Sequence, residues 1–306
     1  MFDELESRLE LSGWVVAQTA FRIGAGRSTA VLGTDLPVVR DALGKPYIPG
    51  SSFKGLLRSR SENLIRAVVW HRRGSCTPTE EAEWCIQSGE KHEDPKWTYP
   101  SGGVSPFDVV GFRDLEKGLP ERGNAQRDTE LSWRVAAESC LACRTFGSPW
   151  LASPVLVRDL LVDESAWFDQ FQVRNGVAID RDTETASEGK LYDYEVIPSG
   201  TRFQFRLLAE NAEPWSLGML FVGLRGFQDG QVAIGGSKSR GLGWIKLDLE
   251  KRTFFSLDGE KGDARIEKLF GFLDGKGFEE VDDKKVKDWI DAFKTELASR
   301  AKEVGA

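Results

Sequence analysis

Apolar residues recur at helical spacing in three stretches of the chain, and each stretch predicts a helix. In the first, Ser51 or Ser52 can cap the helix by accepting hydrogen bonds from its free N–H groups. The second is almost wholly apolar, which predicts a buried helix. The third follows the capping candidates Asp282 and Asp283. The stretches run from Ser52 to about Trp70, from Glu213 to Leu224, and through the last part of the chain from Val286 to Leu297.

Alternating and Val-rich segments predict strands between these helices. They cover residues 9–23, 153–162, 201–208 and 245–249. Residues 173–207 have the pattern of a long hairpin, in which a charged tip at 182–190 separates two strand-like arms. Such a hairpin is either ordinary solvated surface or an arm that contacts a neighbouring protein or inserts into a ligand. Residues 74–135 are broken by prolines and glycines, so we expect an insertion with little regular structure.

Charge is unevenly distributed over the 306 residues. The formal net charge of −7 argues against nucleic acid, yet residues 22–73 contain ten Lys or Arg and three acidic residues. A basic face on an acidic protein suits a polyanion. The chain has no apolar run long enough for a membrane span, and residues 1–6 lack the pattern of a signal peptide. We therefore expect a cytoplasmic protein without a membrane partner.

Four cysteines mark the two ends of the irregular segment. Cys140 and Cys143 form a Cys-x2-Cys hook, and Cys76 and Cys85 are the two distant thiols. Tetrahedral zinc bound by these thiolates would hold a weakly packed insertion in place. His71 or His92 can replace one thiol, and four unrelated buried cysteines remain the alternative. With two histidines in the chain, a Ser-His-Asp catalytic site is a poor fit.

A glycine-rich segment near residue 240 carries two cations and no acidic residue. Its glycines allow close approach of another backbone, but it lacks the spacing of a nucleotide-binding P-loop. The alternative is a simple turn at a strand edge. The candidate binding residues are Gly235, Gly236, Ser237, Lys238, Ser239 and Arg240.

Four motifs follow one another along the chain. They are Tyr47-Ile48-Pro49-Gly50-Ser51-Ser52-Phe53-Lys54-Gly55, Phe146-Gly147-Ser148, the arm at 176–195 and the glycine-rich segment 235–243. This order resembles the RAMP superfamily, specifically the repeated backbone subunits of type III CRISPR effector complexes. The resemblance covers about residues 9–250, and the zinc-like insertion and the long chain favour the D-like subtype.

The resemblance implies an α+β fold with an RRM-like (ferredoxin-like) core. It implies one domain at 1–250, with an insertion at 74–145 and a thumb hairpin at 173–207, followed by a helical extension at 251–306. Family members stack along a CRISPR guide RNA (crRNA) in antiviral defence, together with other effector subunits and further copies of themselves. The helix start and the glycine-rich loop would grip the guide backbone. The phosphate partners would be Ser51, Ser52, Lys54, Arg58, Lys238 and Arg240.

In cleaving members of the family an aspartate in the loop before Pro-x-Ile-x-Asp carries catalysis. Asp35 matches that position here. A carboxylate there can position Mg²⁺ or another divalent cation, or help to deprotonate the 2′-hydroxyl of target RNA. Asp41 is the lesser candidate, because it follows Arg40 and can simply pair with it. Without the family match, Asp35 would be a turn-stabilising residue.

The resemblance therefore predicts a guide-binding subunit that cuts complementary target RNA at regular intervals. One alternative is a non-catalytic crRNA-binding assembly subunit whose neighbours do the cutting. The other is a stand-alone single-stranded RNA-binding protein with an RRM-like sheet. Such a protein would carry a pair of alternating aromatic residues in an RNP-type strand, and the sequence shows no such pair.

Overall fold

A computed structural model describes residues 4–26, 34–70, 72–89, 110–121, 124–177, 180–182, 184–185 and 192–303. Within these ranges, six strands form one antiparallel sheet in the order β10-β11-β1-β9-β5, with β12 paired to β11. The fold is thus α+β, as expected. The strands are β1 (Ser7–Ala17), β5 (Val155–Val157), β9 (Arg202–Glu210), β10 (Val232–Ala233), β11 (Trp244–Ser256) and β12 (Glu279–Glu280).

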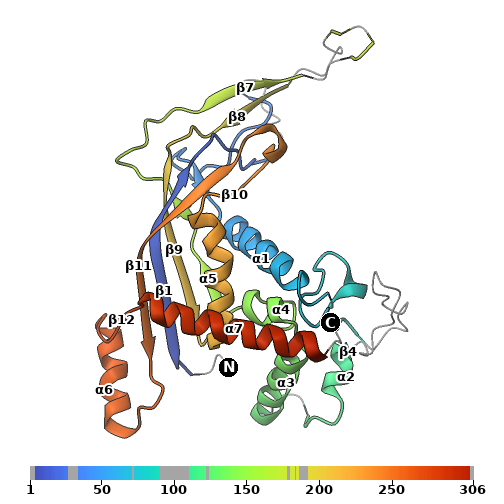
Figure 1. Cartoon of the computed structure of the whole chain (residues 1–306), viewed down its shortest axis with the longest axis vertical. Helices are drawn as coiled ribbons and strands as arrows, with labels where there is room; N and C mark the ends of the chain where they lie inside the picture. The colour runs from blue at the N-terminus through green and yellow to red at the C-terminus, as the bar shows by residue number, and fades with distance from the viewer. Residues whose placement is uncertain are drawn as a thin grey trace.

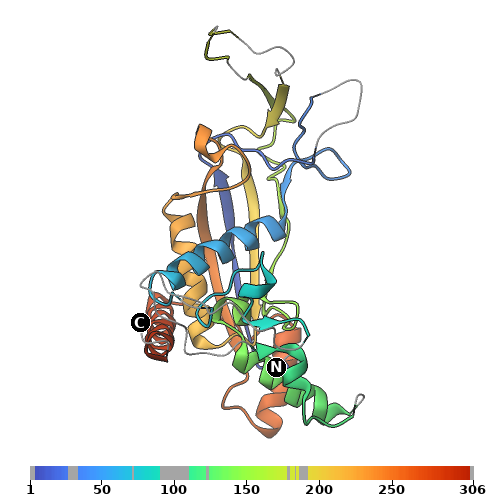
Figure 2. The ribbon, with the colours of Figure 1, turned by 90° about the vertical axis from the view of Figure 1, so that its right-hand side faces the viewer.

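Two helices cover the same face of this sheet (Figures 1 and 2). They are α1 (Gly50–Arg66), which follows β1, and α5 (Pro214–Gln228), which follows β9. The phenyl rings of Phe53 and Phe205 are 5.1 Å apart and those of Phe53 and Phe227 are 4.8 Å apart, so strand and helices share one core. Alternate residues of β1, such as Leu9, Leu11 and Val15, are buried beneath the helices.

Helix α1 begins and ends earlier than the pattern predicted. Its N-cap is Pro49, no side chain caps it, and its last residue is Arg66 rather than Trp70. The prediction of a serine cap was therefore wrong. The first N–H of the helix, from Gly50, is instead satisfied by the carboxylate of Asp159, at 2.7 Å. That residue lies 109 positions away, between β5 and β6 (Leu160–Leu161), so local sequence gave no signal for it.

Gly50 also allows the start of α1 to pack closely on the chain after β5. An added Cβ would lie 2.3 Å from the carbonyl oxygen of Val157. We expect Gly50→Ala to lower the free energy of unfolding by about 1–3 kcal/mol, measured by urea denaturation. In the same helix an added Cβ at Gly55 meets nothing within 4 Å, so Gly55→Ala should stabilise by up to about 1 kcal/mol. Equal effects of the two substitutions would contradict this packing.

The predicted irregular insertion contains more regular structure than expected. Helix α3 (Ala125–Glu138) begins within it, and shorter elements precede α3. These are β3 (Ile86–Gln87), β4 (Val110–Gly111) and α2 (Phe112–Glu116). Residues 90–109 lie outside the described ranges. Helix α4 (Leu141–Phe146) follows α3 and packs beside α1. The predicted strand at 153–162 is interrupted and forms β5 and β6, and β6 pairs with β2 (Tyr47–Ile48).

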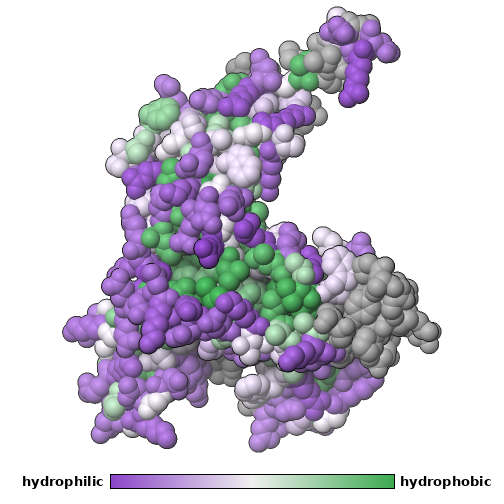
Figure 3. Space-filling view, in the orientation of Figure 1, coloured by the Kyte–Doolittle hydropathy of each residue, from purple (hydrophilic) through white to green (hydrophobic). Residues whose placement is uncertain are grey.

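A separate hairpin extends from one end of the molecule and overhangs the side on which α1 lies (Figures 1 and 3). It consists of β7 (Gln172–Gly176) and β8 (Tyr192–Val196), paired antiparallel. From Arg202 onward the chain is β9 of the main sheet. Most of the predicted tip lies outside the described residues.

The C-terminal part joins the sheet instead of standing apart from it. Strand β11 continues past residue 250 to Ser256. The predicted last helix is confirmed as α7 (Asp283–Glu303), and Asp282 accepts the N–H of Lys285 at 2.7 Å. Helix α7 crosses α5 so closely that a Cβ on Gly218 would lie 2.0 Å from the carbonyl oxygen of Trp289. Helix α6 (Gly262–Leu273) was not predicted. Among the described residues, no helix could cross a membrane.

Candidate nucleic-acid interface and metal centre

Asp35 lies on an exposed bend that runs along the free edge of β8. Leu36 and Tyr194 form a parallel bridge, and the N–H of Glu195 donates to the carbonyl of Leu36 at 3.1 Å. The side chain of Asp35 accepts the N–H of Asp193 at 3.1 Å. In return, the carboxylate of Asp193 accepts the N–H of Asp35 at 2.7 Å. Two carboxylates from segments 158 residues apart therefore stand side by side.

Glu195 holds the rest of the same loop. Its Oε2 accepts the N–H of Val38 at 3.1 Å and pairs with Nη2 of Arg40 at 2.5 Å. The expected pairing of Arg40 with Asp41 is therefore wrong. Asp41 instead accepts the N–H groups of Leu43 and Lys45, each at 2.9 Å, which closes a local turn.

Sequence reasoning missed Asp193 and Glu195. The alternation in Tyr192-Asp193-Tyr194-Glu195 placed both acids on one face of a strand, and that was the available signal. It did not say which segment this face would meet.

The glycine-rich segment folds back against the chain that follows β1. An added Cβ on Gly235 would lie 2.0 Å from the carbonyl oxygen of Arg22, and the N–H of Gly236 donates to that same oxygen at 2.9 Å. Ser237 has a φ of 59°, in the left-handed region. The turn presents Lys238, Ser239 and Arg240 to solvent. Two of the glycines, Gly235 and Gly236, therefore allow close approach of this protein's own backbone at Arg22.

Arg240 connects this segment to β8. Its Nη1 donates to the hydroxyl of Tyr192 at 3.0 Å, and this bond raises the pKa of the guanidinium, which stays charged. Asp35 and Arg240 are therefore both held by β8, through Asp193 and Tyr192 respectively. The predicted catalytic residue and one predicted phosphate partner thus contact neighbouring residues of the same strand, although they are distant in sequence.

The cations of α1 are used inside the molecule. Nζ of Lys54 donates to Ser153 Oγ at 2.8 Å and to the carbonyl of Val155 at 2.9 Å. Burial lowers the pKa of this ammonium, and the nearby Arg58 adds to the effect. Arg58 donates to Glu62 at 2.8 Å and to the carbonyl of Gly147 at 2.9 Å. A role for Lys54 and Arg58 in binding RNA therefore stays a prediction. Each could contact a phosphate only through N–H groups that do not already donate to these protein oxygens.

The two serines at the start of α1 lie in its first turn, with Ser51 exposed and Ser52 partly exposed. The N–H groups of Ser52 and Phe53 both donate to the carbonyl of Pro49. Asp159 already occupies the N–H of Gly50. Few backbone donors of this helix start remain for an anion, so RNA binding by Ser51 and Ser52 stays a prediction.

The four cysteines converge as predicted. Cys76, Cys85, Cys140 and Cys143 are buried, and their sulfur atoms all lie within 4.8 Å of one another. Sulfur atoms around tetrahedral zinc, with Zn–S near 2.3 Å, are separated by about 3.8 Å, so the cluster has nearly the required size. His71 and His92 lie outside the described residues.

The surroundings of the cysteine cluster suit negatively charged thiolates. The N–H groups of Cys76 and Cys143 point at Cys140 Sγ, at 3.5 and 3.4 Å. Nη2 of Arg58 lies 3.4 Å from Cys143 Sγ, so a cation lies against the cluster. Burial opposes the negative charge and raises the pKa of the Cys140 thiol, while hydrogen bonds from Cys140 and Cys143 favour it and lower the pKa of Cys76. The residues therefore fit a metal ion that binds thiolates.

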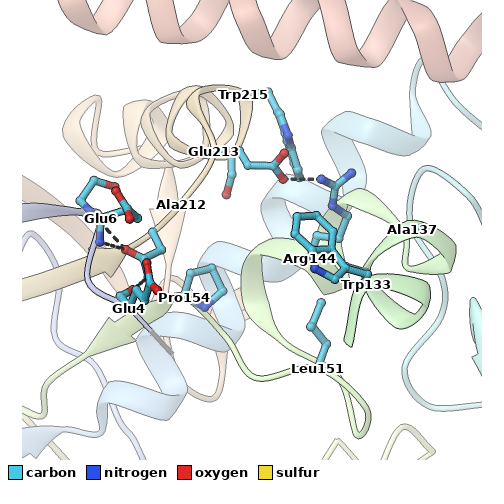
Figure 4. A pocket seen from close by; sticks show the side chains of 14 residues that line it. Glu4, Glu6, Trp133, Ala137, Arg144, Leu151, Pro154, Ala212, Glu213 and Trp215 are labelled. Carbon is cyan, nitrogen blue, oxygen red and sulfur yellow. Dashed lines mark hydrogen bonds and ion pairs between the residues drawn. The ribbon is translucent and has the colours of Figure 1, made fainter. Parts of the chain in front are cut away.

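A hollow of about 640 Å³ lies at the end of the molecule opposite the hairpin, and none of the predicted site residues lines it (Figure 4). Its floor is mainly apolar and includes Trp133 and Trp215. Arg144 pairs with Glu213 at its edge and lies 4.8 Å from the centre of the Trp215 ring.

Comparison with known proteins identifies the family of the chain. A family model described as the RAMP superfamily matches residues 14–246. A relative from Methanocaldococcus jannaschii, "CRISPR system Cms endoribonuclease Csm3", is 24% identical over 255 residues, which cover 79% of this chain and 79% of that protein. A relative of the same name from Methanothermobacter thermautotrophicus is 23% identical over 263 residues, covering 84% of this chain and 91% of that protein. Since the family model matches well over half of the sequence, the chain belongs to the RAMP superfamily.

Proposed function

We propose that this protein is a guide-RNA-binding backbone subunit of a type III CRISPR effector and that it cleaves complementary target RNA through Asp35. One observation carries the proposal: an exposed carboxylate, Asp35, is held beside a second one, Asp193, on strand β8 of a projecting hairpin, and the same strand binds a cation of the glycine-rich loop. Both relatives are named as endoribonucleases, which is consistent with an RNA-cutting role.

The core of the proposed domain is RRM-like. Its support is the order of elements, β1-α1-β5-β9-α5-β11, combined with the spatial order β11-β1-β9-β5 and antiparallel pairing throughout. A split βαβ, ferredoxin-like fold has the same order and pairing, which supports the proposal. In this proposal residues 1–250 form the RNA-binding domain with its insertion and thumb. Residues 251–306 are an extension that completes one edge of the sheet and covers α5.

The proposed RNA path follows the concave side beneath the hairpin, where α1 lies (Figure 3). Guide phosphates contact Lys238, Ser239 and Arg240, which are exposed on the glycine-rich loop. The hairpin then separates guide from target at regular intervals, and Asp35 acts at the target strand next to it. The partners are crRNA, target RNA, other effector subunits and further copies of this chain, in the cytoplasm. The protein reads the RNA backbone while base pairing reads the sequence.

Two metals have separate proposed roles. Mg²⁺ or a similar cation, which prefers oxygen ligands, would be held by Asp35 and would stabilise charge on the scissile phosphate. Zinc would be held by Cys76, Cys85, Cys140 and Cys143 and would fix the start of the insertion to α4 and α1. The support for zinc is the size and burial of the thiol cluster and the donors that surround it.

The guide-binding half of the proposal is tested by gel-shift titration of a labelled guide RNA. We expect replacing Lys238 and Arg240 with alanine to weaken binding and to reduce the slope of log K against log salt by about 0.7 for each lost phosphate contact. Lys284→Ala is the matched control, because this lysine is exposed on α7, far from the hairpin. An unchanged salt slope in the double variant would remove the glycine-rich loop from the guide site.

A further inference from the structure

Strand β8 meets two segments that we place in the RNA site. Its acidic residues, Asp193 and Glu195, contact the loop at 34–40. Tyr192 contacts Arg240 of the glycine-rich loop, and Tyr194 packs with Ala20 and Leu242. The strand is also half of the projecting hairpin. A displacement of the hairpin would therefore act on both segments.

The hydrogen bonds that fix Asp35 itself come from a single residue of the described chain. Among the described residues, Asp193 is the only one that hydrogen-bonds to Asp35, and it does so through both its N–H and its carboxylate. Each carboxylate has one oxygen in this pair of bonds. In the described part of the chain, no hydrogen bond reaches the other oxygen of Asp35, which leaves it for a metal ion or a hydroxyl.

Glu195 fixes the following residues. It accepts the N–H of Val38 and pairs with Arg40, while its own N–H donates to Leu36. The guanidinium of Arg40 also lies 3.9 Å from the ring centre of Phe171, just before β7. Both ends of the described loop are thus attached to the hairpin. In its middle, backbone hydrogen bonds join only Pro37 and Val39 of the described loop to residues 23–25.

We propose, resting on the function proposed above, that β8 sets the position of the catalytic carboxylate. Asp193 and Glu195 are positioning residues, and the hairpin and the Asp35 loop form one unit. A hairpin that wedges into the guide–target duplex then carries Asp35 with it to a fixed place on the target backbone. Cleavage at regular intervals follows from this attachment, because the hairpin that enters the RNA duplex at regular intervals also holds the carboxylate of Asp35.

The test compares Asp193→Ala with Asp193→Asn in the full chain, assembled with guide and partner subunits. Asparagine keeps the oxygen that accepts the N–H of Asp35, whereas alanine does not. We expect the alanine variant to slow single-turnover target cleavage on the order of 10²-fold, because small misplacements of a reacting group have effects of that size. The asparagine variant should retain most of the rate. An asparagine variant as slow as the alanine variant would overturn the positioning role, since it would show that the charge of Asp193 acts directly.

Amide hydrogen exchange provides a readout that does not depend on cleavage. Asp193→Ala should speed exchange at Asp35, whose N–H loses its acceptor, whereas Asp258→Ala, which removes an exposed carboxylate after β11, should not. Unchanged exchange in the alanine variant would overturn the proposal even if cleavage falls. If the wild-type complex does not cut RNA at all, the proposed function fails. The exchange result then decides by itself whether β8 holds the Asp35 loop in place. Should the alanine variant fail to fold, Glu195→Ala takes its place and should speed exchange at Val38, whose N–H donates to the carboxylate of Glu195, and unchanged exchange there would equally overturn the proposal.

Discussion

Asp35→Ala should abolish target cleavage by the assembled complex while guide binding stays unchanged. The carboxylate is exposed and lies on a bend, so its removal leaves the core intact. Loss of a group that helps to deprotonate the nucleophile or holds the metal slows cleavage by about 10²–10⁴-fold. Single-turnover assays on labelled target RNA measure the rate, and gel shifts with labelled guide measure binding.

Asp41→Ala is the matched control, since Asp41 lies in the same segment and only closes the turn at Leu43 and Lys45. We expect this variant to cut target RNA at close to the wild-type rate. If Asp35→Ala cuts as fast as the wild type, Asp35 has no part in the mechanism. If Asp41→Ala is as defective as Asp35→Ala, the conformation of the whole segment, rather than one carboxylate, accounts for the loss.

Cys140→Ser should release the metal and destabilise the protein. Cys140 is a fully buried member of the thiol cluster, and the N–H groups of Cys76 and Cys143 point at its sulfur. Because folding and metal binding are coupled, losing a structural metal lowers the free energy of unfolding by more than about 4 kcal/mol. A chain of this size then melts on the order of 10 °C lower. Elemental analysis should find one zinc per wild-type chain and none in the variant, and a strong chelator should lower the melting temperature of the wild type.

Ser75→Ala tests whether that effect is specific to the thiols. Ser75 is buried next to Cys76, and its hydroxyl has no hydrogen-bond partner among the residues that the structure describes, so its loss should be nearly neutral. A wild-type protein that folds normally without any metal would reject the zinc site. Equal destabilisation by Ser75→Ala and Cys140→Ser would show that general packing, rather than a metal ion, matters there.

Some features could be predicted from the sequence because they depend on local pattern. The apolar repeat of α5 and α7 is confirmed, and so is the convergence of the four cysteines. The Cys-x2-Cys hook places one thiol at the N-cap of α4 and the other in its first turn, a spacing typical of zinc ligands, which is why two further cysteines are expected beside it.

Other features depend on contacts between distant segments, which periodicity does not report. Lys54 and Arg58 have the spacing of a solvated basic face, yet both donate to carbonyls of the chain that follows α4. The first N–H of α1 is satisfied by Asp159 and not by an adjacent serine. Asp193 and Asp35 are 158 residues apart, and their pairing requires the hairpin to lie along the loop. A single sequence carries no record of that pairing.

The most direct test of the central claim is cleavage of a complementary, end-labelled target RNA by the complex assembled on its guide, with Mg²⁺ and with EDTA. Our account predicts target fragments at a regular spacing of a few nucleotides with Mg²⁺ and intact target with EDTA. Guide binding with intact target under both conditions, in a complex whose other subunits are all present, would contradict a catalytic role for this chain.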